Sequence, residues 1–344
     1  MSSSERLQAA LEELARGRGP GVFALVADGA DVVFTGSVGT ADLNRPRAIT
    51  STDRFRIASV TKIYLATVIL QLAAEQRCHL TDSLDAWLPG LVPASEGITL
   101  NHLLRMRSGL PDYVWPVLGD PPDPARLQRY FAPQELVRTA LAQPDRWTPG
   151  KGRRYSNTDY ILLGLIVEEV TRQSLAEVFR QRIFAPLHLD LTYMPSSEVH
   201  IEGRHVRGYV RLDRDVGYID STEFTPSESW SAGAIISTPS DLAVFLDALL
   251  GGRLLEPRWL ALMRTTPAIG GDLGYGMGLA SYTLGNGTAL YGHGGTHFGV
   301  DCYAFRSDAG RTVIIYQNSW DRVARGIPRQ NPFLEATFTA SIRD

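Results

Sequence analysis

The chain has 344 residues, of which 44% are hydrophobic and 21% charged, with a formal net charge of −3. These values are typical of a globular protein with one large or two closely associated domains, and they exclude a disordered chain. A slightly acidic chain lacks the positive field that phosphate backbones require, so nucleic acid is not expected as a main partner. Two cysteines, Cys78 and Cys302, cannot build a disulfide framework or a four-ligand zinc site.

The N-terminal segment 1–21 mixes acidic and basic residues with alanine and leucine, and no positive stretch leads into an apolar one. We therefore expect no signal peptide and a cytoplasmic location. The longest apolar stretch, residues 63–74, is interrupted by Thr67 and Gln71 and is too short to cross a bilayer. No membrane partner is expected.

In the first part of the chain, leucines at helical spacing predict a helix over 7–14. The runs 22–26 and 32–35 flank an Asp-Gly turn and predict an antiparallel hairpin. From Thr61 onward, apolar residues at 63, 68, 69, 72 and 73 predict a long, largely buried helix with Ser59 in its first turn.

Helical patterns then continue to about residue 189, and β-like runs return from residue 205. The proline-rich segment 111–133 is expected to be an irregular lid or rim. Further helices are expected at 83–88, 100–106, 133–142, 159–172, 174–184, 241–250 and 332–341, and further strands at 205–212, 234–237, 277–282, 300–306 and 312–317.

This order of elements predicts an α+β fold in which both chain ends contribute to one antiparallel sheet, flanked by terminal helices. We expect a discontinuous sheet domain of residues 1–58 plus 200–344 and a mostly helical domain of residues 59–199. The active cleft would lie between them.

Lysine is rare in this chain, which has only Lys62 and Lys151 beside 32 arginines. A buried lysine can lose its proton and act as a base, whereas arginine cannot. Lys62 follows Ser59 by three residues, so on a helix both side chains share one face, and the helix N-terminus offers N–H groups to an oxyanion. Alone, the Ser-x-x-Lys pattern is more often an N-cap serine followed by a surface lysine.

Two further segments favour a catalytic role for Ser59 and Lys62. Residues 154–157 read Arg-Tyr-Ser-Asn before a predicted helix, and residues 291–296 read Tyr-Gly-His-Gly-Gly-Thr and link two β-like runs. With Ser59-x-x-Lys62, these motifs resemble, in order, those of the penicillin-recognising serine enzymes. That family includes class C β-lactamases, DD-carboxypeptidases, D-aminopeptidases, and family VIII esterases and transacylases. Residues 54–59, 107–110, 231–234 and 274–279 also resemble DD-peptidase landmarks, and the likeness covers roughly residues 20–320.

The resemblance implies a three-layer β-lactamase/transpeptidase-like fold and an acyl-enzyme mechanism. Ser59 would attack a carbonyl, while Lys62 and the Tyr155 hydroxyl share its proton and pass it to the leaving group. Asn157 would hydrogen-bond Lys62 and an amide on the acyl side of the substrate. Backbone N–H groups of Ser59 and Thr296 would form the oxyanion hole. A tyrosine beside a cation can have a lowered pKa, which suits a base near neutrality.

His293 stands where members of the family have lysine or histidine, and would support Tyr155 electrostatically and by a hydrogen bond. Gly294 and Gly295 would let the substrate approach the strand closely. A metal site at His293-x-x-x-His297 is disfavoured because the two glycines make a helix improbable there. We expect no metal and no cofactor.

Trp115, Tyr113 and Trp230 are candidates for an apolar substrate wall, with simple core packing as an equal alternative. The chain has neither the G-x-S-x-G motif of α/β-hydrolases nor the G-x-x-x-x-G-K-[ST] motif of nucleotide hydrolases.

The expected function is that of a serine hydrolase or acyltransferase that cleaves an ester or amide of a small molecule or peptide through acyl-Ser59, as an intracellular esterase, amidase or transacylase. A D-stereospecific peptidase, such as a DD-carboxypeptidase or D-aminopeptidase, is the alternative. A non-catalytic ligand-binding relative is the alternative of another class. Water, an amine or an alcohol could each be the acyl acceptor, since the same residues serve all three.

One departure from the family concerns the leaving side. DD-carboxypeptidases place an arginine after the Gly-Tyr-Gly-x-Gly-Leu stretch and a threonine in the middle of the third motif, and both hold the substrate's free carboxylate. Here those places are Ala280 and Gly294. An anion without its guanidinium partner keeps its desolvation cost. The sequence therefore predicts weak activity on peptides ending in D-Ala-D-Ala and a preference for an uncharged leaving side.

Overall fold

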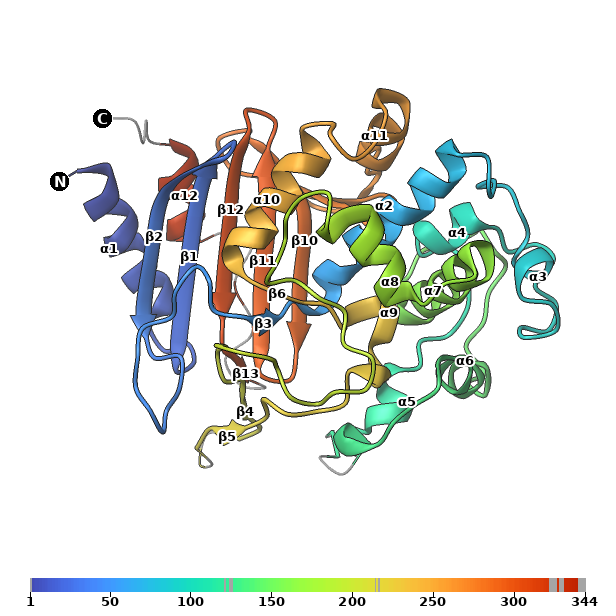
Figure 1. Cartoon of the computed structure of the whole chain (residues 1–344), viewed down its shortest axis with the longest axis horizontal. Coiled ribbons are helices and arrows are strands. Elements are labelled where there is room, and N and C mark those ends of the chain that lie inside the picture. The colour runs from blue at the N-terminus through green and yellow to red at the C-terminus, as the bar shows by residue number, and fades with distance from the viewer. Residues whose placement is uncertain are drawn as a thin grey trace.

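The computed structural model describes residues 2–120, 122–123, 126–213, 215, 217–321, 327 and 331–339. Its centre is an eight-stranded antiparallel sheet in the order β2-β1-β12-β11-β10-β9-β8-β7 (Figure 1). The N-terminal hairpin joins the C-terminal strands through pairing of β1 with β12, so both chain ends build one sheet, as expected. Its strands are β1 (Gly21–Asp28), β2 (Asp31–Gly39), β7 (Ala268–Gly270), β8 (Leu273–Tyr275), β9 (Ala280–Thr283), β10 (Ala289–His297), β11 (Val300–Ser307) and β12 (Arg311–Gln317).

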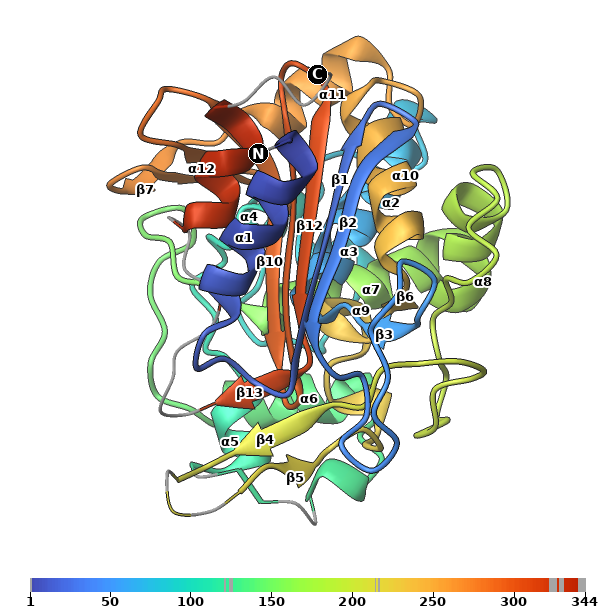
Figure 2. The ribbon, with the colours of Figure 1, turned by 90° about the vertical axis from the view of Figure 1, so that its left-hand side faces the viewer.

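Helices cover both faces of this sheet. Figure 2 shows α1 (Ser3–Ala15) and α12 (Pro332–Thr339) on one side and α10 (Pro239–Leu250) on the other. A capping box between Ser2 and Glu5 begins α1, whose leucines are buried against the sheet. With apolar cover on both faces, β12 is buried along almost its whole length. The result is the three-layer α+β fold that the sequence predicted.

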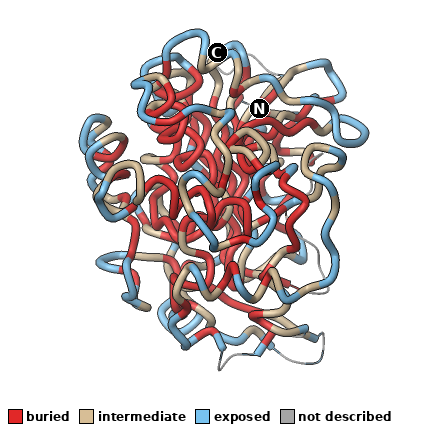
Figure 3. The backbone as a smooth tube through the Cα atoms, turned by 90° about the vertical axis from the view of Figure 1, so that its right-hand side faces the viewer, coloured by how far each residue is buried: buried red, intermediate tan, exposed pale blue. Residues whose placement is uncertain are grey.

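The helical region packs around α2 (Thr61–Ala74), of which twelve of fourteen residues are buried. A helix that is apolar on all sides belongs in a core, and Figure 3 shows the interior of the molecule as continuously buried. Tyr64 of α2 stacks on Phe245 of α10 at 3.6 Å between ring centroids, which ties the helical region to the sheet layer. The other helices are α3 (Leu84–Trp87), α4 (Leu100–Leu104), α5 (Val114–Leu118), α6 (Pro133–Leu141), α7 (Asn157–Thr171), α8 (Leu175–Phe179), α9 (Trp230–Gly233) and α11 (Pro257–Arg264).

Some local expectations were wrong. Residues 291–296 do not link two strands but lie within β10, because the ladder to β11 runs without a break from Leu290 to His297 and needs no side chains. The segment 111–133 is not wholly irregular, since it contains α5. The helix expected over 332–341 is described as far as Thr339, and its last two positions lie outside the described residues.

Two small sheets complete the fold. The first has the order β13 (Ser319–Asp321), β4 (Tyr209–Arg211) and β5 (Ile219–Asp220), and the second pairs β3 (Phe55–Arg56) with β6 (Ile236–Ser237). Within the described residues, no helix is both long and apolar enough to span a bilayer. The division into a sheet domain of 1–58 plus 200–344 and a helical domain of 59–199 stays a proposal.

Candidate active site

A tight turn places Ser59 at the edge of the core, where its side chain is partly exposed to solvent. The chain leaves β3 and passes through Ala58, whose φ of 48° is in the left-handed region that a residue with a Cβ adopts only under strain. A 3₁₀ turn, Ala58–Val60, then leads directly into α2. Ser59 therefore lies just before the helix and not in its first turn, and it is partly exposed while both neighbours are buried.

Lys62 is fully buried beneath Ser59, and its Nζ has three oxygen neighbours. They are Ser59 Oγ at 3.1 Å, Asn157 Oδ1 at 2.9 Å and the Ala232 carbonyl oxygen at 2.7 Å. Burial lowers the pKa of Lys62 from 10.5 to about 7, although the charges of Asp112 and Glu228 oppose this shift. A neutral amine would donate to the amide and carbonyl oxygens and turn its lone pair to the Ser59 proton.

The N-terminus of α7 holds the Tyr155–Asn157 motif in place. Ser156 is the N-cap: its Oγ accepts a hydrogen bond from the Asp159 backbone N–H and donates to the Asp159 carboxylate at 2.9 Å. The Ser108 hydroxyl donates to the same carboxylate at 2.5 Å. Burial raises the pKa of Asp159 to about 7. These buried hydrogen bonds fix the motif beside α2.

Asp112 sets the orientation of the Asn157 amide, and the sequence analysis missed it. Its Oδ2 accepts the Asn157 backbone N–H at 2.6 Å and the Nδ2 amide group at 3.1 Å. With Nδ2 held by a carboxylate, Oδ1 is the amide atom that faces Lys62. The expected contact between Asn157 and Lys62 is therefore present, and it depends on an aspartate that nothing in the motif singled out.

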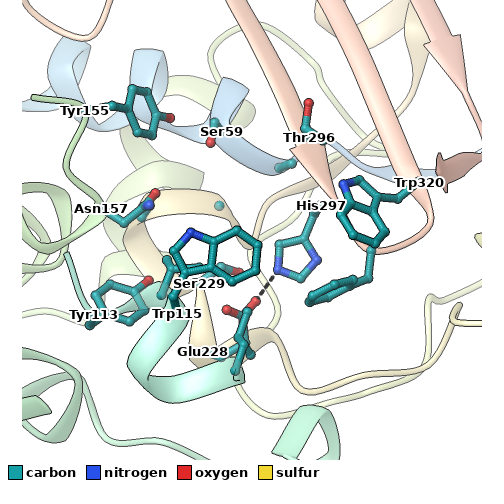
Figure 4. A pocket seen from close by; sticks show the side chains of 16 residues that line it. Ser59, Tyr113, Trp115, Tyr155, Asn157, Glu228, Ser229, Thr296, His297 and Trp320 are labelled. Atoms are coloured by element: carbon teal, nitrogen blue, oxygen red, sulfur yellow. Dashed lines mark ion pairs between the residues drawn. The ribbon is translucent and has the colours of Figure 1, made fainter. Parts of the chain in front are cut away.

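Tyr155 is 39% exposed, and its hydroxyl points toward Ser59 (Figure 4). Desolvation in the cleft raises the pKa of Tyr155 above its usual value of 10. The expectation of a lowered pKa was wrong, because the desolvation of Tyr155 outweighs the lowering effect of the nearby Arg153 charge. Of Lys62, Tyr155 and His293, Lys62 is the one whose pKa lies near neutrality.

His293 contacts a different tyrosine from the one expected. Its Nδ1 lies against the Gly294 carbonyl oxygen, to which it can only donate, so Nε2 is the acceptor for the Tyr275 hydroxyl at 3.1 Å. Burial and the charge of Lys62 lower the pKa of His293 to about 3, which keeps the ring neutral. The hydrogen bond predicted with Tyr155 goes to Tyr275, and the Tyr155 ring lies 6.2 Å away between centroids.

Strand β10 passes close to the turn that carries Ser59. A Cβ on Gly295 would lie 2.3 Å from the Ile57 carbonyl oxygen, so glycine is required there for packing of one backbone on another. Gly294 is exposed, and a Cβ there would meet only the Cys302 carbonyl oxygen, at 3.8 Å; Thr296 lines the same cavity as Ser59. Among the described strands, β9 pairs with β10 only as far as Gly292, which leaves the outer half of this edge free.

A cavity of about 240 Å³ opens beside Ser59. Tyr113, which is buried, and Trp115, which is 54% exposed, both line it, as expected of a substrate wall. Trp230 is not among the lining residues and packs against Gly164 of α7, which agrees with the core-packing alternative. Further lining residues that the sequence did not indicate are Phe298, Trp320, Glu228 and Ser229.

His297 lines this cavity and pairs with Glu228, whereas His293 pairs with Tyr275. Over the ranges that the structure describes, no three histidine, cysteine or acidic side chains gather as metal ligands.

The β-lactamase family model matches residues 7–331 of this chain. The chain belongs to the β-lactamase family. Members of this family are serine hydrolases, and similar solved structures are amidases, so the protein is an enzyme of the serine hydrolase class. The prediction of a penicillin-recognising serine enzyme is confirmed.

Individual relatives agree with this β-lactamase family membership. A D-stereospecific amidohydrolase from Streptomyces sp. is 33% identical with a TM-score of 0.88, and the match covers 98% of each chain. The D-amino acid amidase from Ochrobactrum anthropi SV3 in complex with D-phenylalanine is 29% identical with a TM-score of 0.85, over 97% of this chain and 98% of that one. Penicillin-binding protein 4* from Bacillus subtilis (strain 168) is 28% identical over 246 residues, which are 65% of this chain but only 51% of that protein. The chain thus spans about half the length of this curated relative.

In this β-lactamase family enzyme, Tyr155→Phe is expected to lower kcat by about 10²- to 10⁴-fold, because the hydroxyl beside Ser59 is lost while the ring stays. Steady-state kinetics at pH 8, where Lys62 is mostly neutral, measures this effect. A rate within threefold of wild type would leave Lys62 as the sole proton carrier.

Asp112→Asn is expected to shift the acid limb of the kcat/KM profile to lower pH. Asp112 is the largest of the charges that raise the pKa of Lys62, so its removal lets that pKa fall further below about 7. The matched control is Asp145→Asn, an exposed aspartate paired with Arg154, which should leave the limb in place. An unchanged limb in Asp112→Asn would contradict the electrostatic role.

Proposed function

We propose that this enzyme is a D-stereospecific amidase, which hydrolyses amides of D-amino acids or short D-peptides through acyl-Ser59. The observation that carries the proposal is the placement of Ser59, Lys62 and Asn157 in one hydrogen-bonded chain at the mouth of a largely aromatic cavity. Two similar enzymes over almost the full length of the chain are described as acting on D-amides, and this supports the same substrate class here.

In the acylation step, neutral Lys62 takes the Ser59 proton and Ser59 Oγ forms a bond to the amide carbonyl carbon. The resulting oxyanion would be held by the backbone N–H groups of Ser59 and Thr296. Collapse of the tetrahedral intermediate breaks the carbon–nitrogen bond. The proton held by Lys62 passes through the Tyr155 hydroxyl to the departing amine.

In the second step, water attacks acyl-Ser59 and its proton returns along the same path to Ser59 Oγ. The products are the free acid and ammonia or an amine. Asn157 would receive the substrate's acyl-side amide, where one is present, while its Oδ1 continues to hold Lys62.

Paired D and L substrates test this proposal. We expect kcat/KM for D-phenylalanine amide to exceed that for L-phenylalanine amide by at least 100-fold, with ammonia released in a one-to-one ratio to the acid. Equal rates for the two enantiomers would contradict D-specificity. Turnover of a phenyl ester without turnover of either amide would favour the esterase alternative.

The leaving side is expected to be uncharged. Ala280 is buried on β9 and Gly294 has no side chain, so neither offers a positive group to a free carboxylate. One acyl group presented as a D-Ala-D-Ala peptide and as its C-terminal amide should react faster as the amide, by about tenfold or more. A clear advantage for the free acid would contradict this prediction.

Transfer of the acyl group from Ser59 to an amine is a second candidate activity, because another pocket adjoins the site. It measures about 550 Å³ and is lined by Asp112, Trp115, Tyr155 and Asn157, among others, so an acceptor held there would lie beside the acyl group. Product analysis with and without an added D-amino acid amide separates the two activities: a new dipeptide amide indicates transfer, and free acid alone indicates hydrolysis.

A further inference from the structure

A carboxylate lies inside the cavity at some distance from the catalytic groups. Glu228 ends a short 3₁₀ turn, Pro226–Glu228, that Thr225 caps, and it is only 1% exposed. Of the sixteen lining residues, all in the described part of the chain, it is the one acid. Figure 4 shows Ser59 toward one end of the cavity and Glu228 at the other.

The partner of Glu228 is His297 of β10. Glu228 Oε1 and His297 Nε2 lie 2.6 Å apart, yet neither atom has a hydrogen bond of normal geometry within the described residues. The imidazole is held by its neighbours: it stacks on Phe224 at 4.7 Å and meets the edge of Phe298 at 5.0 Å, both between centroids. Glu228 thus lines the cavity with a carboxylate whose buried Oε1 has no hydrogen bond of normal geometry within the described residues.

Two buried cations feel the charge of Glu228 without a direct contact to it. The Arg56 guanidinium donates through Nη2 to the carbonyl oxygens of Val199 and Phe224, its Nε and Nη1 have no hydrogen-bond partner among the described residues, and it is not among the lining residues. Lys62 responds to the charge of Glu228 but makes its hydrogen bonds around Ser59. A buried carboxylate whose direct partner is a histidine gains a charge-assisted hydrogen bond from a further cation that contacts it.

The rest of that end of the cavity is aromatic. Figure 4 shows Trp115 and Trp320 on this side of the cavity with Glu228, and Phe298, which also lines the cavity, packs against His297. Aromatic faces around a carboxylate suit an ammonium group, which gains a charge-assisted hydrogen bond and cation–π attraction at once. A second carboxylate, by contrast, would be repelled.

We propose that Glu228, positioned by His297, binds a primary ammonium group on the acyl part of the substrate. This inference rests on the proposed function, because it assumes that the acyl part of the substrate lies in the cavity beside Ser59. It adds to that function a positive charge on the acyl part. The ammonium could be the α-amino group of an amino acid amide or the end of a basic side chain, and the experiment separates these two sources.

Binding is measured by calorimetry in the Ser59→Ala variant, which does not depend on turnover. Two ligand pairs are used. D-Phenylalanine amide is compared with N-acetyl-D-phenylalanine amide, which lacks the α-ammonium. N-Acetyl-D-lysine amide is compared with N-acetyl-D-norleucine amide, which lacks the side-chain ammonium. We expect one pair to show at least a tenfold tighter binding of the ammonium ligand.

Glu228→Gln in the same background should reduce that ratio by about 10- to 100-fold, the range for a lost hydrogen bond to a charged group. Glu228→Asp keeps the charge and should retain part of the preference, which separates charge from folding. The matched control is Glu223→Gln, because Glu223 also pairs with a histidine, His200, but both side chains are exposed. This control should leave the ratio unchanged.

No preference in either pair, or a preference that survives in Glu228→Gln, overturns the inference. These outcomes are independent of the D-amidase proposal. Wild-type enzyme that fails to hydrolyse D-amides but shows the ammonium preference would overturn that proposal alone. D-amide hydrolysis without the preference would overturn only the role of Glu228.

Discussion

Ser59→Ala is expected to abolish turnover, with a loss of about 10⁵-fold or more in kcat, and to abolish labelling by a fluorophosphonate probe. The Ser59 hydroxyl is partly exposed, accepts a hydrogen bond from Lys62 Nζ, and is the group toward which the Tyr155 hydroxyl points. Removing one hydroxyl at the mouth of a cavity changes little packing, so the melting temperature should stay within a few degrees. Intact-mass spectrometry after labelling measures the covalent step.

The matched control for Ser59→Ala is Ser229→Ala. Ser229 lines the same cavity, but its hydroxyl donates to the Pro226 carbonyl oxygen and has no contact with Lys62 among its described hydrogen bonds. This variant should still be labelled. Retained labelling in Ser59→Ala would mean that another serine is the nucleophile.

Lys62→Arg is expected to lower kcat by about 10³-fold or more, almost as much as Ser59→Ala. Arginine keeps the positive charge but cannot give up its proton, so it cannot act as the base. The wild-type pH profile follows from the same group. With a pKa of about 7, the neutral fraction of Lys62 grows as pH rises. kcat/KM should therefore rise about tenfold per pH unit on the acid side and level off above about pH 7 to 8.

The chain provides its own control in Lys151→Arg, since Lys151 is exposed and is the other lysine of the sequence. It should retain wild-type activity. A Lys62→Arg variant within tenfold of wild type, or a wild-type profile that is flat between pH 5 and 8, would contradict the role of Lys62 as the base.

The sequence by itself determined the family and the architecture of this protein. Spacing of apolar residues located α1, α2, α7 and the hairpin of β1 and β2, because these periodicities follow from burial of one face or of the whole element. The Ser59-x-x-Lys62 pair was predictable since two residues three apart on a helical turn must be neighbours. The sequence did not predict a strand over residues 291–296, because glycine is unusual in strands. β10 forms there through its backbone hydrogen bonds to β11, which need no particular side chains.

Only the tertiary structure decided which side chains of the site contact one another and which residues line the cavity. Asp112 orients Asn157 from another loop, Tyr275 takes the hydrogen bond of His293, and Glu228 meets His297 across 69 positions of the chain. No local pattern encodes such contacts, since they exist only after distant segments pack together. Burial decided the protonation behaviour of the site, because it lowers the pKa of Lys62 and raises that of Tyr155. Desolvation depends on the folded surroundings of a group and not on its residue type.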